Sequence, residues 1–223
     1  MKIRPRNRRI KHSRGYKKPG LKNWGFGTIL LIVASIFASV TVGKILTHKF
    51  LHRGTPRALV LSQWRRYWPG QSQLSLELPA EPRPGSVEVP ESLLATIKQA
   101  KRYEYSIKGF KVAVWEAVYV DGVTTDIQQA AEGAASDLKQ SEGVSEYHDT
   151  VTPTALSGRP ALMITGSFRR YDEREEIKAL LLADGPELWQ VIITYPASDR
   201  NASVASRRVL DSVQIESKST ASG

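Results

Sequence analysis

Apolar and polar positions divide the chain into one long uncharged segment followed by many short, alternating ones. Residues 24–43 read WGFGTILLIVASIFASVTVG and contain no charged side chain. A helix rises about 1.5 Å per residue, so about twenty apolar residues cross the ~30 Å hydrocarbon core of a bilayer. The pattern therefore predicts a transmembrane helix at 24–46, with a cleaved signal peptide as the alternative interpretation.

The segment after the predicted span has a helical pattern, and a proline-rich stretch follows it. In residues 56–68 (PRALVLSQWRRYW), Leu61 and the two tryptophans recur at i, i+3 and i+7. This spacing predicts either an interfacial helix that faces the bilayer or a stalk helix that packs on a domain. Because residues 79–90 contain four prolines, 47–90 is predicted to form a juxtamembrane helix and a Pro-rich linker.

Short alternating segments then predict strands. Residues 74–78 alternate leucine with polar residues and predict a short strand, whereas 91–100 (ESLLATIKQA) predicts a short helix. Further strands are expected at 102–107 and 111–120. The last of these strands is largely apolar on both faces, which implies that other parts of the fold cover both faces.

A helical pattern with small apolar residues follows these strands. Thr125 and Gln128 form a possible capping box, and Gly143 ends the pattern. The apolar positions at helical spacing are Ile127, Ala130, Ala131, Ala134 and Leu138. We therefore expect an amphipathic helix at 126–141, and its small alanines allow a close approach to a sheet.

The last third of the chain predicts an antiparallel meander and a closing helix. Three strands joined by tight turns are expected at 161–171, 174–183 and 188–195. Ser198 or Asp199 caps a helix that ends near Leu210, and a short strand at 212–215 is expected to return to the sheet. The polar residues 217–223 are expected to be disordered.

Three segments carry a likeness to a known fold. They are LSGRPA at 156–161, DGPELWQVIITY at 184–195 and VLDSV at 209–213. With the order of strand, long helix, meander, helix and short strand, they resemble the PsbP-like family, whose fold the Ran-binding Mog proteins share. The resemblance covers about 100–216, and the domain is expected at 91–216. It implies an α+β fold in which helices flank a mostly antiparallel sheet, as an α/β/α sandwich. The family is not enzymatic, so the resemblance implies a binding or assembly role.

Charge is distributed unevenly along the chain, and its distribution predicts which segments bind lipids and how the span is oriented in the membrane. Residues 1–23 contain ten basic and no acidic side chains and predict a disordered basic tail. Residues 44–76 add six basic side chains, whereas 77–223 carry 16 basic and 22 acidic ones, a net charge of −6. We expect the basic flanks to bind membrane lipids and the domain to bind no nucleic acid. The larger basic excess before the span predicts a cytoplasmic N-terminus and an extracytoplasmic domain.

Residues that carry catalysis or bind metals are sparse in the predicted domain. The chain has no cysteine, which excludes disulfides and thiolate metal sites. Three of the four histidines lie in the basic segments, and His148 is alone in the domain. The glutamates within 173–176 are interpreted as a solvated hairpin end rather than as paired catalytic carboxylates. We therefore expect a non-enzymatic protein with no cofactor and no metal site.

The hairpin between the first two strands of the meander is the candidate binding surface. It carries Arg169, Arg170, Tyr171 and Arg174, and arginine and tyrosine are enriched in the hot spots of interfaces. The alternative interpretation is a hairpin that its charges keep soluble. The leading functional hypothesis is a single-pass membrane protein whose extracytoplasmic domain binds or assembles another membrane or envelope component.

Two other functions stay open. The first is a small-ligand sensor or carrier with a pocket between the predicted helix at 126–141 and the sheet. An apolar cavity larger than about 300 Å³ would favour it. The second is an enzyme that uses carboxylates alone, which requires acidic side chains to converge in one cleft.

Overall fold

The structure, a computed structural model, describes residues 59, 61–87, 89, 94–123 and 125–216. The predicted basic tail, the predicted transmembrane helix and the C-terminal tail lie outside these residues. Within the described part of the chain, no helix is both long and apolar enough to cross a bilayer.

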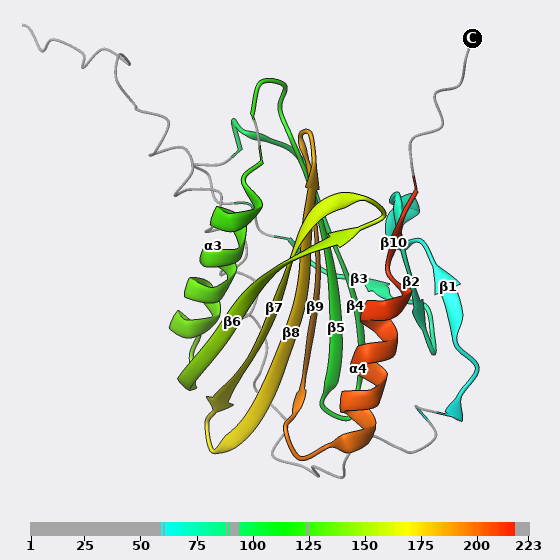
Figure 1. Ribbon diagram of the computed structural model, residues 1–223, viewed down its shortest axis with the longest axis vertical. Coiled ribbons are helices and arrows are strands. Elements are labelled where there is room, and N and C mark those ends of the chain that lie inside the picture. The colour runs from blue at the N-terminus through cyan, green and yellow to red at the C-terminus, as the bar shows by residue number, and fades with distance from the viewer. Residues whose placement is uncertain (1–58, 60, 88, 90–93, 124, 217–223) are drawn as a thin grey trace, which may run out of the picture.

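Seven antiparallel strands of the described chain form the main sheet, in the order β3-β4-β5-β9-β8-β7-β6 (Figure 1). They are β3 (Arg83–Pro84), β4 (Ile97–Ile107), β5 (Phe110–Tyr119), β6 (Val144–Leu156), β7 (Arg159–Arg170), β8 (Glu173–Asp184) and β9 (Glu187–Pro196). Hairpins join β6 to β9 in succession, so the predicted antiparallel meander is confirmed. The predicted strands β4 and β5 are also present, and both lie on the β9 side of the meander.

Two segments of the sheet differ from the sequence-based expectation. The predicted helix at 91–100 is wrong for residues 97–100, because β4 begins at Ile97 and pairs with β5. Pairing in the sheet satisfies the backbone of both strands and overrides the helical spacing. The pattern also does not predict β6, whose side chains are mostly exposed. β6 is an edge strand, and this position tolerates its Pro153.

A second, three-stranded sheet packs beside the main one. Its order is β1-β2-β10, and its strands are β1 (Arg65–Tyr67), β2 (Leu74–Leu78) and β10 (Gln214–Ile215). The 3-10 helix η2 (Pro69–Gln71) connects the first two strands. The strand predicted at 74–78 is confirmed, but the closing strand pairs with β2 and not with the main sheet.

The helix predicted at 56–68 is wrong over β1, and its proposed bilayer face is wrong at Trp64. β1 instead pairs with β2 as an antiparallel strand. The guanidinium of Arg66 supports this pairing, since it donates hydrogen bonds to the Ser75 side chain and to the Ser212 carbonyl. Trp64 packs against the core, and the guanidinium of Arg208 lies 4.5 Å from its ring centre. At Trp64 the segment therefore packs on the domain, as the alternative interpretation expected, whereas Leu61 and Trp68 of the same predicted face are exposed.

Two helices cover the two faces of the main sheet, which makes the described fold α+β and mostly antiparallel (Figure 1). α3 (Ile127–Gln140) begins after Asp126, whose side chain accepts hydrogen bonds from the backbone of Gln128 and Gln129. The predicted cap at Thr125 is therefore wrong by one residue. α4 (Arg200–Ser212) begins after Asp199, one of the two predicted caps.

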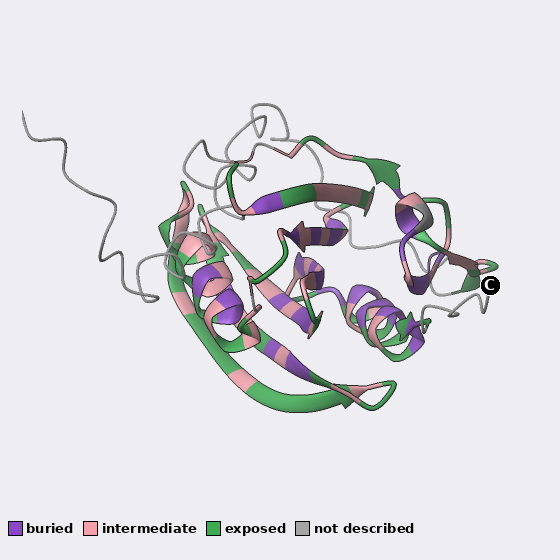
Figure 2. Ribbon diagram, turned by 90° about the horizontal axis from the view of Figure 1, so that it is seen from above, coloured by how far each residue is buried: buried purple, intermediate pink, exposed green. Residues whose placement is uncertain are grey.

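The sheet separates two hydrophobic cores, and adjacent residues of its central strands enter different ones. The α4 core contains Val191 and Ile193 of β9, together with leucines of β2. The α3 core contains Trp115 of β5 and Leu181 of β8. Figure 2 shows the buried residues concentrated between the helices and the central strands. The prediction that β5 is covered on both faces is thus confirmed.

Candidate functional site

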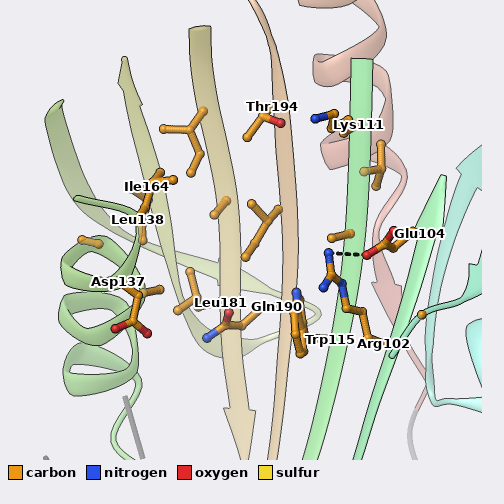
Figure 3. Close-up of a pocket in the computed structure, with 18 of the residues that line it drawn as sticks. Arg102, Glu104, Lys111, Trp115, Asp137, Leu138, Ile164, Leu181, Gln190 and Thr194 are labelled. Carbon is orange, nitrogen blue, oxygen red and sulfur yellow. Dashed lines mark ion pairs between the residues drawn. The ribbon is translucent and has the colours of Figure 1, made fainter. Parts of the chain in front are cut away.

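A cavity of about 380 Å³ lies between α3 and the main sheet (Figure 3). Its floor is made by β4, β5, β9, β8 and β7, which are neighbours in the sheet. Ala134, Ala135 and Leu138 of α3 line its wall. The small side chains of this helix leave space that a larger residue would fill.

Strand pairing arranges the floor in rows that run across the sheet. In one row, Trp115 pairs with Arg102 on one side and with Gln190 on the other, and Gln190 in turn pairs with Leu181. All four side chains line the cavity. Gln190 thus lies on the central strand of the floor, between an indole ring and an aliphatic side chain.

Gln190 is fully buried, and its side chain lacks partners. Among the described residues, neither its Nε2 nor its Oε1 atom has a hydrogen-bond partner. Leaving a buried polar group unpaired costs about 1–3 kcal/mol, so native proteins rarely retain one without a reason. The amide can donate and accept at the same time, but both of its polar atoms are closed to a water-sized molecule in this structure.

The β4 end of the cavity is charged. The guanidinium of Arg102 forms an ion pair with Glu104 and lies 4.7 Å from the ring centre of Trp115. Burial lowers the pKa of Arg102, although the charge of Glu104 opposes this effect. The Nε atom of Arg102 is buried and, in the described structure, has no hydrogen-bond partner. Trp115 of β5 separates Arg102 from Gln190 in this row.

The α3 end contains a carboxyl group in a partly apolar setting. Burial raises the pKa of Asp137 to about 6. Its Oδ2 atom is buried and has no hydrogen-bond partner among the residues described. In Figure 3, Asp137 and Arg102 lie at opposite ends of the cavity, with Gln190 between them. The β4 end thus carries the Arg102–Glu104 ion pair, and the α3 end carries the carboxyl group of Asp137.

The predicted hairpin surface is divided between solvent and the cavity. Tyr171 is 58% exposed, and Arg169 and Arg174 are exposed as well. Arg169 pairs with Glu146 at 3.2 Å. Arg170 instead lines the cavity, and binding through these four residues stays a prediction.

Backbone geometry fixes the position of Tyr171 at the tip. Tyr171 has a φ angle of 55°, and its N–H donates a 2.7 Å hydrogen bond to the Gly143 carbonyl. A Cβ atom at Gly143 would come within 2.7 Å of the Tyr171 ring, so only glycine fits beneath the ring without a shift. An exposed tyrosine held in this way is suited to contact another molecule.

The other chemical candidates from the sequence do not gather into a site. His148 lies on the edge strand β6 and is exposed. Across the described residues, no three histidine, aspartate or glutamate side chains lie close enough to hold a metal ion. No motif in the sequence distinguishes Gln190, Arg102 or Asp137. One feature could have indicated that Gln190 is unusual: it is the single polar residue in the run LWQVII of 188–193.

Comparisons with known proteins yield fold neighbours only. No family model and no curated protein matches the chain. A cyanobacterial PsbP from Synechocystis, CyanoP, is 12% identical with a TM-score of 0.48, over 74% of this chain and 99% of CyanoP. LpqN, which is involved in cell envelope biogenesis of Mycobacterium tuberculosis, is 12% identical with a TM-score of 0.45, over 70% of this chain and 91% of LpqN. At this identity, the likeness concerns the course of the backbone and not the ligands or partners.

Proposed function

We propose that this chain is a non-enzymatic, membrane-anchored binding protein whose domain holds a small ligand between α3 and the main sheet. One observation carries the proposal: a cavity of about 380 Å³ lies between α3 and the main sheet, with aliphatic side chains of β7, β8 and α3 and charged side chains of β4 in its lining. This volume lies within the range of small-molecule sites. The lining residues include no histidine, and the two lining carboxylates, Glu104 and Asp137, lie at opposite ends, which favours binding over carboxylate catalysis.

The anchor and the location are part of the proposal and rest on the sequence. The uncharged residues 24–43 supply the membrane span, and the basic flanks bind anionic headgroups. The charge bias places the N-terminus in the cytoplasm and the domain outside it. The ligand would therefore be an extracytoplasmic molecule.

A variant that fills the cavity tests the ligand-binding proposal. In Ala134→Trp, the indole occupies space beside the floor, so we expect small molecules that co-purify with the wild-type chain to fall at least about tenfold. The measurement is mass spectrometry of small molecules released from the purified full-length protein. Lys139→Trp, at an exposed position of the same helix, is the matched control and should retain them. Equal content in Ala134→Trp and Lys139→Trp would contradict the proposal.

A second candidate function, the binding of a protein partner in the membrane or envelope, is favoured by the fixed, exposed Tyr171 and its two exposed arginines. We expect the double variant Arg169→Glu and Arg174→Glu to lose a partner that crosslinks to the wild-type chain in native membranes, because rim charges steer association. Arg170 is left unchanged because it lines the cavity. Arg200→Glu with Arg207→Glu, at exposed positions of α4, controls for the change in net charge. A partner captured equally by both double variants would exclude the hairpin as its binding surface.

A further inference from the structure

Positive charge is concentrated on one part of the folded domain. The elements β1, β2 and α4 contain five arginines and two acidic residues, a net charge of +3. The residues between β2 and α4, 79–199, contain 12 basic and 19 acidic side chains, a net charge of −7. An anionic surface therefore repels most of the domain and attracts the part that β1, β2 and α4 form.

One side of α4 is exposed and carries three of these arginines. Its exposed residues recur at i, i+4, i+7 and i+8, the spacing of a single helical face, and they are Arg200, Val204, Arg207 and Arg208. The opposite side of the helix packs in the α4 core. Arg208 pairs with Glu77 at 3.1 Å, whereas neither Arg200 nor Arg207 forms an ion pair within the described part of the chain. The charges of these two arginines are therefore available to a partner.

The exposed side of α4 continues onto the second sheet. A shallow groove lies between the helix and strands β1 and β2, and its charged lining residues are Arg66, Glu77, Arg207, Arg208 and Asp211. Arg66 of β1 donates a 3.0 Å hydrogen bond to the Ser212 carbonyl at the end of α4. The helix and β1 thus form one basic surface, made by the exposed side of α4 and this groove.

Exposed apolar side chains accompany the arginines of this basic surface. Side chains alternate along an extended strand, so Trp68 lies on the same side of β1 as Arg66. Trp68 is 45% exposed, and Leu61, in the segment before β1, is 73% exposed. Tryptophan is enriched at the membrane–water interface, where its ring lies at the level of the headgroups. Arginines together with an exposed tryptophan favour an anionic bilayer over a soluble acidic partner.

The course of the chain places the basic surface near the membrane. Residues 24–43 form the proposed span, and residues 44–58 connect it to Leu59, which packs in the α4 core. A segment of this length extends at most about 55 Å. The chain therefore enters the domain at its basic part, within reach of the bilayer that holds the span.

We infer that the domain docks on the anionic lipid bilayer that holds its anchor, with the basic surface of α4 and β1 against the headgroups. α3 and α4 lie on opposite faces of the main sheet (Figure 1), so this docking directs the cavity beside α3 away from the bilayer. The inference rests on the proposed membrane anchor and names the face of the domain that the membrane contacts. It does not depend on the ligand.

A spin label on α4 tests the docking. Because the chain has no cysteine, a nitroxide can be attached at one introduced cysteine, Val204→Cys on α4 or Ser136→Cys at an exposed position of α3. The full-length protein is reconstituted in nanodiscs of phosphatidylcholine, or of equal parts of phosphatidylcholine and phosphatidylglycerol. Electron paramagnetic resonance measures the collision rate of the label with a water-soluble nickel complex. We expect the anionic lipid to lower this rate at least about threefold at position 204 and to leave it unchanged at position 136.

Charge reversal separates docking from tethering by the anchor. Arg200→Glu with Arg207→Glu is expected to abolish the protection at position 204, because repulsion replaces attraction. Arg169→Glu with Arg174→Glu makes the same change in net charge on the hairpin and is expected to keep the protection. Salt at about 1 M shortens the Debye length to about 3 Å and is expected to remove the protection from the wild-type chain.

Three results would overturn the inference: equal collision rates at position 204 in the two lipids, equal protection at position 136, or protection that survives in Arg200→Glu with Arg207→Glu. In each of them the anchor stands, because the nanodiscs hold the protein. A chain that does not enter the nanodiscs would contradict the anchor itself. Docking then still predicts that the full-length protein sediments with vesicles that contain phosphatidylglycerol and not with pure phosphatidylcholine vesicles. Sedimentation with neither kind of vesicle would overturn the inference as well.

Discussion

Arg170→Glu is expected to lower the free energy of unfolding by roughly 3–5 kcal/mol, because breaking a buried ion pair leaves an uncompensated charge. The side chains of Arg170 and Glu175 are only 12% and 16% exposed, and their Nε–Oε1 distance is 3.5 Å. This distance makes an ion pair but no hydrogen bond, since Nε of Arg170 has no hydrogen-bond partner among the described residues. The variant would place two carboxylates together at this site. Urea unfolding of the full-length protein, followed by tryptophan fluorescence, measures the effect.

The neighbouring arginine provides the control for this prediction. Arg169 pairs with Glu146, but these side chains are 44% and 69% exposed, so Arg169→Glu is expected to cost less than about 1 kcal/mol. In Arg170→Glu with Glu175→Arg, part of the lost stability is expected to return because the opposite charges again face each other. Similar losses in Arg169→Glu and Arg170→Glu would contradict the assignment of Arg170 to the interior.

Trp189→Ala is expected to cost roughly 3–5 kcal/mol, the range for removing a large buried aromatic side chain. Trp189 is fully buried in the α4 core, and its Nε1 atom donates a 3.1 Å hydrogen bond to the Ser72 side chain. The indole thus links β9 to the start of β2, in the second sheet. The free energy of unfolding from urea titration is again the measurement, and a single transition would indicate that the two sheets unfold together.

Trp68→Ala is the matched control for the large side chain. Trp68 is 45% exposed, and its Nε1 atom bonds to Glu216 at the surface, so its loss is expected to cost less than about 1 kcal/mol. Trp189→Phe keeps most of the buried area but removes one of the two donors to the Ser72 hydroxyl, since the Leu74 N–H remains, and an intermediate loss is expected. A cost for Trp189→Ala no larger than that of Trp68→Ala would show that the indole does not hold the two sheets together.

Local patterns in the sequence were sufficient for the meander, the closing helix and the two-sided burial of β5. Alternation and tight turns such as Asp184-Gly185 determine such elements over a few residues. They were not sufficient for 97–100, where pairing with the next strand, β5, overrides the helical spacing, or for β10, whose partner β2 lies far away in the sequence. Both outcomes depend on contacts with another segment and not on the local pattern alone.

The candidate site was only partly predictable for a related reason. The alanines of the helix at 126–141 indicated where space might remain against the sheet, and the cavity lies there. The pattern could not distinguish Arg170 from Arg169, because on a strand adjacent residues face opposite sides and the identity of the covered side depends on the whole fold. Gln190 similarly becomes a candidate only once its burial and its missing partners are known.

The alternation of β9 between two cores has a consequence for how this protein can diverge. Residues 189, 191 and 193 hold the sheet to α4 and β2, whereas 190, 192 and 194 face the cavity. Neighbouring codons therefore fall under different selection. Substitutions in one set change the lining of the cavity, while the other set continues to maintain the scaffold. Conservation along β9 would then alternate, with the residues of the α4 core more conserved than the residues that line the cavity.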